Sequence, residues 1–477
     1  MNENAFVSWR DYEGLDGFGT ASQSDVSDLR KALAAGQSVA NPGASSGEGF
    51  PLRVESLERT LKVVTYRMDD VRLWKAISKL PAYNTVEEYN RLQEYGANDF
   101  GGFIAEGDLP ESDDSLYSRE FTIIKYIGTT RSVTHVMSLV RPAHGPVIAQ
   151  ETVNGTAHLL KQIEKALFFG DSSLVSQQWD GLKPLITAGA PAANIIDLRG
   201  QPLSEDVLND GGLTVKTSPN YGRATDLYCA DGAYSDLAKS FYPAERIPLP
   251  PGGWQDGMVG LSIRGFHSMV GPILFSPDVF IEFGGPENAG AVGAAATRPG
   301  TPTEDVAPAA AGVGSQFIAS DAGDYNYKVV AVNRYGKSAP LALTGPVTVA
   351  AGNSVTFSIG DGSPVATAYE IYRSPKDGAV GTELLMETVA KGADPTVITD
   401  DNSDLPGMST AFLIQQNVEF FSFKQLAPFV KIPLATVDTS IRWMQLLYGA
   451  PTVYAPGKSV LYKNVGRAAG SVGGGGA

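Results

Sequence analysis

Residues 146–170 read PVIAQETVNGTAHLLKQIEKALFFG, and this stretch carries the clearest secondary-structure signal in the chain. Apolar side chains recur every three to five residues, a spacing that places them on one face of an α-helix. They are Ile148, Val153, Ala157, Leu160, Ile163 and Leu167. Pro146 is typical of a helix start, and Gly170 is typical of a helix end. The pattern predicts one helix of roughly 24 residues, which would be about 35 Å long.

Upstream of this helix, residues 81–145 predict an extended excursion. Tyr117–Val140 is rich in Thr, Ile, Val, Tyr and Phe, a composition typical of β-structure. Residues 84–95 are ambiguous, because Thr85 and Glu88 could form a capping box at a helix start, whereas two sets of side chains also alternate as in a strand. Residues 96–116 are polar and rich in Gly and Asp. The simplest account is two strands that run out and back, with an exposed acidic tip.

The first 80 residues predict a loosely attached arm that contains short helices. One short helix is predicted after Ser24 or Asp25, either of which can cap it, and a turn-rich linker follows at residues 41–49. Two further helical stretches are predicted near Val54–Val64 and Asp69–Leu80.

Downstream of the long helix, the sequence predicts short mixed elements and then a β-rich module. Thr225–Tyr242 predicts a strand followed by a helix, and Gly271–Phe283 predicts β-structure. Gly284–Gly300 is rich in Gly, Ala and Pro and predicts a linker. Short β-segments follow at turn-separated spacing, the pattern of a β-sandwich of about 100 residues. Examples are Tyr325–Asn333, Val347–Val349, Val355–Ile359, Ala368–Tyr372 and Thr396–Thr399.

The sequence around this predicted sandwich indicates an insertion. Residues 300–408 contain thirteen acidic and six basic residues, so nearly half of the net charge of −15 lies in less than a quarter of the chain. A strongly acidic small domain is usually solvated. Apolar density returns over residues 409–467, before a Gly-rich tail at 468–477 that predicts disorder. The sandwich therefore interrupts a host domain that the C-terminal strands complete.

The composition argues against several classes of protein. The single cysteine, Cys229, excludes an internal disulfide and a cysteine-based metal cage. The first ten residues lack a signal peptide's basic end and apolar run, and no stretch approaches the ~20 apolar residues of a membrane span. We therefore expect a soluble, cytosolic chain with no membrane contact. An acidic chain without a basic stripe is not expected to read DNA directly, although a container can still tolerate DNA against its wall.

No catalytic, cofactor-binding or metal-ligating constellation is predicted. The four histidines lack the spacing of zinc ligands. They are His135, His144, His158 and His267. Gly43–Gly47 matches a serine-hydrolase pattern, but it lies in the turn-rich linker. Pro456–Ser459 resembles the end of a phosphate-binding loop without its first glycine, which favours a hairpin turn. Asp400–Asp404 lacks the glycine and the distal glutamate of a calcium loop, which favours an acidic turn.

Several local patterns occur in a characteristic order along the chain. They are Tyr83–Asn90 with Tyr95-Gly96, Gly107–Glu111 with Phe121–Tyr126, Phe168–Asp171 with Trp179–Leu182, Ala224–Leu237, and Leu446–Ala450 with Tyr454–Lys458 and Lys463–Val465. Their order resembles that of the tailed-phage major capsid family, which has the Hong Kong 97-type coat fold. The resemblance favours a strand at residues 84–95, as the outgoing limb of the family's extended loop. Residues 325–338 and 368–373 resemble strands of an immunoglobulin or fibronectin III domain.

The resemblance implies an α+β fold with an all-β insertion. Its parts would be an N-terminal arm (1–80), an extended loop with flanking strands (81–145), a spine helix with peripheral and axial domains (146–285), a linker and inserted immunoglobulin-like domain (286–408), closing strands (409–467) and a disordered tail (468–477). The implied function is that of a major capsid protein, not an enzyme, which self-assembles into an icosahedral head around double-stranded DNA.

The implied partners and location follow from this function. Copies of the chain would form hexamers and pentamers, joined by a portal and by scaffolding or decoration proteins, with DNA contacted without sequence specificity. The location would be the virion, and the host cytoplasm during assembly. Two alternatives stay open: a tail or baseplate protein with an immunoglobulin-like carbohydrate-binding module, and a nanocompartment shell protein.

Subunit contacts are predicted at the tip of the extended loop. The candidate residues are Asp108, Leu109, Pro110, Glu111, Asp113 and Asp114. Some family members weld subunits through a lysine on this loop joined to an asparagine elsewhere. This chain has no lysine between Glu94 and Glu120, and the first one afterwards is Lys125. We therefore predict a shell without covalent cross-links.

Overall fold

The computed structural model describes residues 64–96, 103–109, 112–140, 145–241, 263–287, 290–435 and 438–468. The predicted helices before residue 64, the Gly43–Gly47 match and nearly all of the predicted tail lie outside the described residues. Within them, the protein combines helices with several β-sheets and has two separate hydrophobic clusters.

The long helix is present as predicted and forms α4 (Val147–Phe169). Ile163 and Leu167 of the predicted apolar face are fully buried. Val153 of that face is half exposed, and Leu159, which was not assigned to it, is fully buried. Packing of this face positions the helix, because helix stability in proteins comes mainly from packing. The helix ends at Gly170, whose amide donates to the carbonyl of Ala166 (3.0 Å). A Cβ at Gly170 would lie 2.4 Å from that carbonyl oxygen, so this end of the helix requires glycine.

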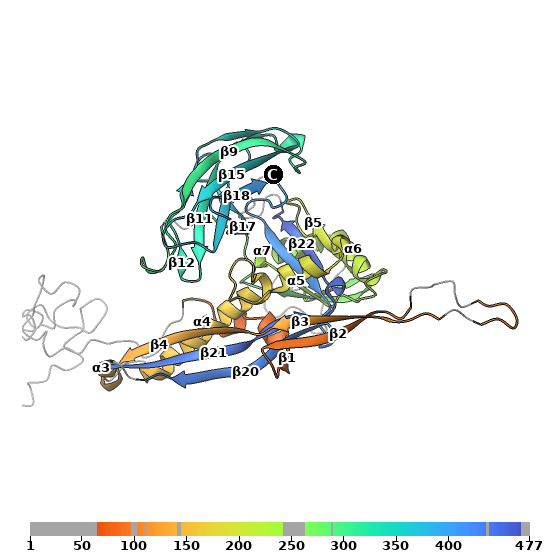
Figure 1. The fold of residues 1–477 in the computed structure, drawn as a ribbon, viewed down its shortest axis with the longest axis horizontal. Coiled ribbons are helices and arrows are strands. Elements are labelled where there is room, and N and C mark those ends of the chain that lie inside the picture. Colours follow the sequence, from red (N-terminus) through yellow and green to blue (C-terminus); the bar gives the residue numbers. More distant parts are fainter. Residues whose placement is uncertain are drawn as a thin grey trace, which may run out of the picture. The chain divides into compact units, whose positions relative to one another are not determined.

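A four-stranded sheet in the order β1-β20-β21-β4 lies along α4 (Figure 1). Its strands are β1 (Ser78–Pro81), β20 (Phe421–Pro433), β21 (Ser440–Val453) and β4 (Lys125–Thr134). The amide of Gln445 on β21 donates to the carbonyl of Thr152 on α4 (2.9 Å), and Lys431 on β20 donates to the Thr152 hydroxyl (2.9 Å). Sequence-distant strands therefore build one layer beneath the long helix.

The prediction of one helix over Asp69–Leu80 is wrong from Ser78 onward, where the chain forms a strand. The structure has a 3-10 turn at Met68–Asp70 and a single α-turn, α2 (Leu73–Ala76), before β1 begins. β1 pairs in parallel with β20, with Ser78 opposite Ser422. This pairing overrides a local helical pattern that is only about two turns long, since propensity is a weak determinant beside tertiary contacts.

A six-stranded sheet in the order β5-β22-β19-β6-β8-β7 holds the second part of the larger core. Its strands are β5 (Ile195–Asp197), β22 (Val460–Val465), β19 (Ser409–Ile414), β6 (Asp226–Cys229), β8 (Gly271–Pro277) and β7 (Gly265–Ser268). The accompanying helices are α5 (Leu182–Gly189), α6 (Glu205–Lys216) and α7 (Asp231–Phe241). The predicted strand–helix pair at Thr225–Tyr242 is therefore present, as β6 and α7. Phe168 of α4 stacks on Phe412 of β19 (ring centroids 5.4 Å apart), which joins the spine helix to this sheet.

The ambiguous segment at residues 84–95 is a strand. β2 (Val86–Glu94) pairs antiparallel with β3 (Leu116–Ile123), so the out-and-back excursion is confirmed and the capping-box alternative is wrong. The chain then enters β4 and a short helix, α3 (His135–Leu139), where the Thr134 hydroxyl accepts from the Met137 amide (3.4 Å).

Residues 303–400 form a β-rich module with its own hydrophobic cluster. One sheet contains β12 (Gly336–Lys337), β11 (Tyr327–Asn333), β16 (Ala368–Arg373) and β17 (Leu384–Ala390), with β13 (Leu341–Ala342) also on β11. Another contains β18 (Thr396–Asp400), β15 (Asn353–Gly360) and β9 (Thr303–Val313), and β10 (Gly323–Tyr325) pairs with β14 (Val347–Val349). Each segment named as an example is a strand here, whereas β9, β12, β13 and β17 lie outside these segments.

The strands on either side of this module lie in the same sheet. β8 ends at Pro277 and β19 begins at Ser409, and both pair with β6 in the six-stranded sheet. This arrangement supports the predicted insertion. The assignment of the module to the immunoglobulin class, and the domain boundaries as a whole, stay predictions.

The turn at Pro456–Lys458 differs from the predicted hairpin. It is a 3-10 turn that joins β21 to β22, and these two strands belong to different sheets. In the described part of the chain, no helix combines the length and the apolar character needed to cross a membrane.

Candidate assembly interface

The hairpin β2–β3 presents two faces of opposite character. Residues directly opposite each other in an antiparallel pair share a face, so the register of the hairpin assigns every side chain. We call the exposed set the outer face: Val86, Glu88, Asn90, Leu92, Tyr117, Arg119, Phe121 and Ile123. The half-buried set, the inner face, consists of Glu87, Tyr89, Arg91, Ser118, Glu120 and Thr122.

The inner face lies on the residues around the end of β21. The Tyr89 ring meets the Tyr454 ring edge to face, with centroids 4.8 Å apart. The Arg91 guanidinium pairs with Glu120 (3.0 Å) and also donates to the Tyr454 carbonyl (3.4 Å). The Thr452 hydroxyl donates to the Thr122 hydroxyl (3.3 Å). The face that touches the protein's own body is therefore mostly polar and hydrogen-bonded.

The outer face is apolar and open to solvent. Tyr117 is 67% exposed and Phe121 is 64% exposed, and Val86, Leu92 and Ile123 are each more than two-fifths exposed. Glu88 and Arg119 form an exposed ion pair (3.3 Å) on the same face. This distribution is the reverse of that of a surface hairpin, which buries its apolar face. Contiguous exposed apolar side chains are typical of a protein interaction surface.

The predicted contact residues at the tip are only partly described. The Asp108 carboxylate accepts from the Leu109 amide (2.9 Å), and the Leu109 side chain is 86% exposed. The side chain of Asp113 lies against Gly96, because a Cβ there would come within 2.5 Å of its Oδ2 atom. Asp114 is exposed, whereas Pro110 and Glu111 lie outside the described residues. The structure does not test a subunit contact at these six positions, so that contact stays a prediction.

Sequence reasoning missed the apolar residues of the hairpin, both on the outer face and near the tip. Phe103 and Ile104 near the tip are exposed as well. The available signal was the two-residue alternation of both strands, which becomes informative only when the register between them is known. The acidic tip could be predicted as a contact site because charged residues are recognised in the sequence without knowledge of the strand register.

A second exposed apolar group lies at α3, where β4 ends. Val136, Leu139 and Val140 are all more than half exposed, although the Thr134 hydroxyl at the end of β4 caps α3. Like the outer face, this group of exposed apolar side chains is typical of a protein interaction surface.

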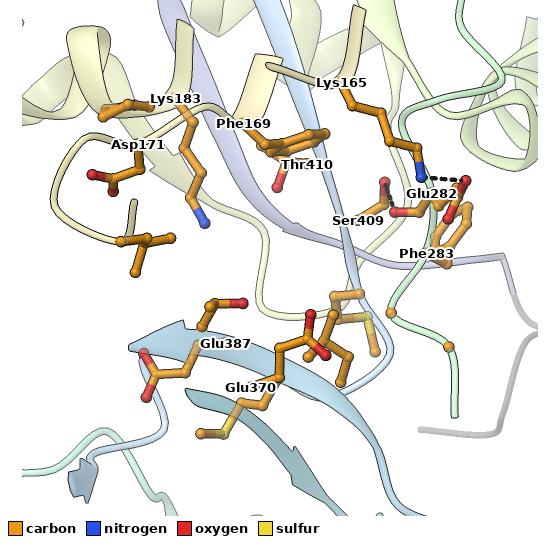
Figure 2. Close-up of a pocket in the computed structure, with 18 of the residues that line it drawn as sticks. Lys165, Phe169, Asp171, Lys183, Glu282, Phe283, Glu370, Glu387, Ser409 and Thr410 are labelled. Carbon is orange, nitrogen blue, oxygen red and sulfur yellow. Dashed lines mark hydrogen bonds and ion pairs between the residues drawn. The ribbon is translucent and has the colours of Figure 1, made fainter. Parts of the chain in front are cut away.

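A cleft of about 790 Å³ lies between α4, α5 and the module strands β16 and β17. Figure 2 shows Lys165 of α4 reaching Glu282 (3.0 Å), and on the module side Lys337 pairs with Glu370 (2.6 Å). Burial, followed by neighbouring aspartates, raises the pKa of Glu387 in the cleft to about 7. Each of these two pairs joins residues on the same side of the cleft, so neither pair crosses from the module to the larger core.

The cleft does not assemble a reactive centre from the residues that the structure describes. Its described lining includes no histidine or cysteine, and the Ser409 hydroxyl donates to the carbonyl of Glu282 (3.2 Å). Over the described ranges, no group of three or more His, Cys, Asp or Glu side chains is placed to hold a metal ion. Asp400, the first residue of the acidic turn, pairs instead with Arg373 (2.6 Å). Cys229 is buried, which raises the pKa of its thiol to about 12 and keeps it protonated.

Comparison with known proteins finds relatives that match most of the chain. No protein-family model matches the sequence. The chain is 27% identical over 440 residues to the major capsid protein of Staphylococcus phage K, covering 87% of this chain and 90% of that protein. It is 26% identical over 443 residues to a putative major capsid protein of Enterococcus phage phiEF24C, covering 88% and 91%.

Two solved structures align with most of the chain at lower sequence identity. The capsid of a native GTA particle is 8% identical, with a TM-score of 0.47, covering 90% of this chain and 99% of that one. The Gordonia phage Cozz structure is 12% identical, with a TM-score of 0.44, covering 90% and 96%.

Proposed function

We propose that this chain, which belongs to the major capsid protein family of tailed bacteriophages, builds an icosahedral head through contacts of its extended hairpin with neighbouring copies. The described residues have an α+β fold. The relatives, which are named as major capsid proteins, do not favour the tail, baseplate and nanocompartment alternatives. The observation that carries the proposed contact is the inverted polarity of the β2–β3 hairpin.

The energetics favour association of the outer face with another copy. Fully burying a Val, Leu, Ile or Phe side chain stabilises by about 1.5–3 kcal/mol, so the half-exposed residues of this face each contribute roughly half as much when covered. Association also costs translational and side-chain freedom, so one such contact is weak. Closed symmetry repeats the same contact in every subunit and leaves no free edge, which makes the shell stable as a whole.

The remaining partners are inferred from the resemblance to major capsid proteins and not from a binding site on this chain. We infer a structural, non-enzymatic role, assembly in the host cytoplasm, and a head that incorporates a portal and scaffolding or decoration proteins. The net charge of −15 is consistent with a wall that encloses double-stranded DNA without gripping it. The module at residues 303–400 is proposed as an acidic, immunoglobulin-like insertion.

A paired substitution on the outer face tests the function. We expect Tyr117→Ser combined with Phe121→Ser to prevent shell formation, because both side chains are mostly exposed in the protomer and need a partner to be covered. The melting temperature of the unassembled chain is expected to change by less than about 2 °C, since little packing is lost. Negative-stain microscopy and size-exclusion chromatography would measure both properties.

Asn90→Ser is the matched control, because Asn90 is a polar residue on the same face of the same hairpin. Polyhedral shells from the control and the wild type, with none from the double variant, would support the proposal. Shells from all three would overturn the role of the outer face. Tubes or fibres from the wild-type chain would instead indicate a tail protein.

A further inference from the structure

Glu164 holds the chain that leads into the extended hairpin. This residue lies on α4 and is fully buried. Its carboxyl group accepts three backbone hydrogen bonds, from the amides of Arg72 (2.8 Å), Leu73 (2.6 Å) and Trp74 (2.9 Å). These amides lie at the start of α2, where the first turn of a helix has no partners of its own. One side chain of the spine helix therefore fastens the segment that continues through β1 into β2.

Asp278, just after β8, brings a second carboxyl group to the same place. It is also fully buried, and one of its oxygens accepts from the Phe280 amide (2.8 Å). Its other oxygen, Oδ2, is buried without a hydrogen-bond partner among the described residues. The two carboxyl groups interact directly. A proton between them satisfies this oxygen, whereas two charged carboxylates would repel each other in a buried site.

The pair faces charged groups from several elements. Arg72 of the fastened segment is a cation that acts on Asp278, and Asp231 at the start of α7 adds a further carboxyl group. Glu164 acts on Lys79 of β1 and on the buried Tyr228 of β6. Asp70 in turn acts on Asp231. Carboxyl groups outnumber the two cations, Arg72 and Lys79, around the pair. These cations therefore do not neutralise a second negative charge on Glu164 and Asp278.

We propose that Glu164 and Asp278 share one proton and form a pH-sensitive latch that fastens the root of the extended hairpin to the spine helix. At a pH below the loss of the shared proton, the pair carries one negative charge, which the three backbone amides stabilise. Loss of the shared proton creates a second buried charge, which is relieved when residues 72–74 leave the carboxyl group. The latch would therefore tie the position of the assembly hairpin to pH. It concerns the protomer alone and does not depend on the proposed shell contact.

The direction of the pH effect follows from the pKa values. Burial raises the pKa of Glu164 to about 8, and it also raises the pKa of Asp278. An acid whose folded-state pKa is raised binds a proton more tightly when folded. Its stabilising contribution is complete below the unfolded pKa and is lost as pH rises through the folded pKa. The latch is therefore closed in mildly acidic and neutral solution and opens above about pH 8.

Hydrogen exchange of the full-length chain tests the latch. After correction for intrinsic exchange rates, the amides of residues 72–74 are expected to lose protection about tenfold between pH 7 and pH 9.5, relative to amides of α5. Asp278→Asn should keep these amides protected at both pH values, since its side-chain amide can donate to a charged Glu164. Glu164→Gln should leave them weakly protected at every pH, because one of the three acceptor contacts becomes a donor.

Glu282→Gln is the matched control, because this nearby glutamate is exposed and pairs with Lys165. The control should show the wild-type pH response. The same loss of protection in Asp278→Asn as in the wild type would overturn the proposal. Constant protection in the wild-type chain would also overturn it, and this second readout does not depend on whether any variant folds.

Discussion

At the scale of single residues, the module is held together by a buried charge. Arg373 is buried, and its guanidinium donates to Asp400 (2.6 Å) and to the side-chain oxygen of Asn402 (2.7 Å). The Tyr327 hydroxyl also donates to Asp400 (2.8 Å). Such a network need not be more stable than an apolar core, but removing one partner leaves an uncompensated charge. The sequence showed Asp400 only as part of an acidic turn.

We expect Asp400→Asn to destabilise the module by about 3 kcal/mol, because Arg373 would keep a buried charge without its counter-ion. Differential scanning calorimetry of the full-length chain would show a lower melting temperature for one transition. Asp401→Asn is the control. Its exposed carboxyl group accepts from the Ser403 amide (3.0 Å), so a change below about 1 kcal/mol is expected. Equal effects of the two variants would contradict the account.

At the scale of elements, the junction after α4 determines how the spine helix meets the rest of the larger core. The amide of Gly181 donates to the carbonyl of Gly170 (2.8 Å), and the Trp179 indole donates to Ala166 (3.0 Å). The backbone approaches closely here, because a Cβ at Gly170 would lie 2.4 Å from the oxygen of Ala166 and 2.6 Å from that of Trp179. Both oxygens belong to the backbone, so neither can rotate away from an added Cβ as a flexible side chain could.

We expect Gly170→Ala to destabilise the chain by about 1–3 kcal/mol, the usual range for an overpacked site. Thermal unfolding followed by circular dichroism at 222 nm would measure the loss. Gly285→Ala is the matched control, because a Cβ there meets nothing within 4 Å. If both variants melt together with the wild type, the close approach at the end of α4 is not required.

At the scale of the whole molecule, a shell without covalent cross-links stays a prediction from the sequence. There is no lysine between Glu94 and Glu120. Lys125 lies instead on β4, where its ammonium group donates to the carbonyl of Ser176 (2.7 Å) and is thus turned toward its own protomer. Cohesion of the shell then depends on apolar burial and polar contacts repeated over many subunits.

We therefore expect mature particles to dissociate completely in boiling detergent. Denaturing electrophoresis under reducing conditions should show one band near 50.4 kDa, or a trimmed form of it. The reductant removes any disulfide through Cys229 as an explanation for larger species. A ladder of covalent multimers that survives this treatment would contradict the prediction.

Elements with a strong local signal could be predicted from the amino-acid sequence. α4 has a helical periodicity over its whole length, and the strands of the module have β-branched and aromatic runs between turns, so each could be predicted from a short window. β9 was missed because its Thr-Glu-Asp-Val-Ala-Pro-Ala-Ala-Ala-Gly-Val sequence has poor strand propensity, and only its pairing with β15 makes it a strand.

Features that depend on residues far apart in the sequence became visible in the folded protein alone. β1 is a strand because β20 lies beside it, and the outer face of the hairpin is apolar because the register aligns Phe121 with Glu88 and Tyr117 with Leu92. Glu164 and Asp278 are far apart in sequence and become a pair only when the two elements pack. Periodicity fixes which residues share an element, whereas pairing, register and burial depend on contacts between elements that no local window contains.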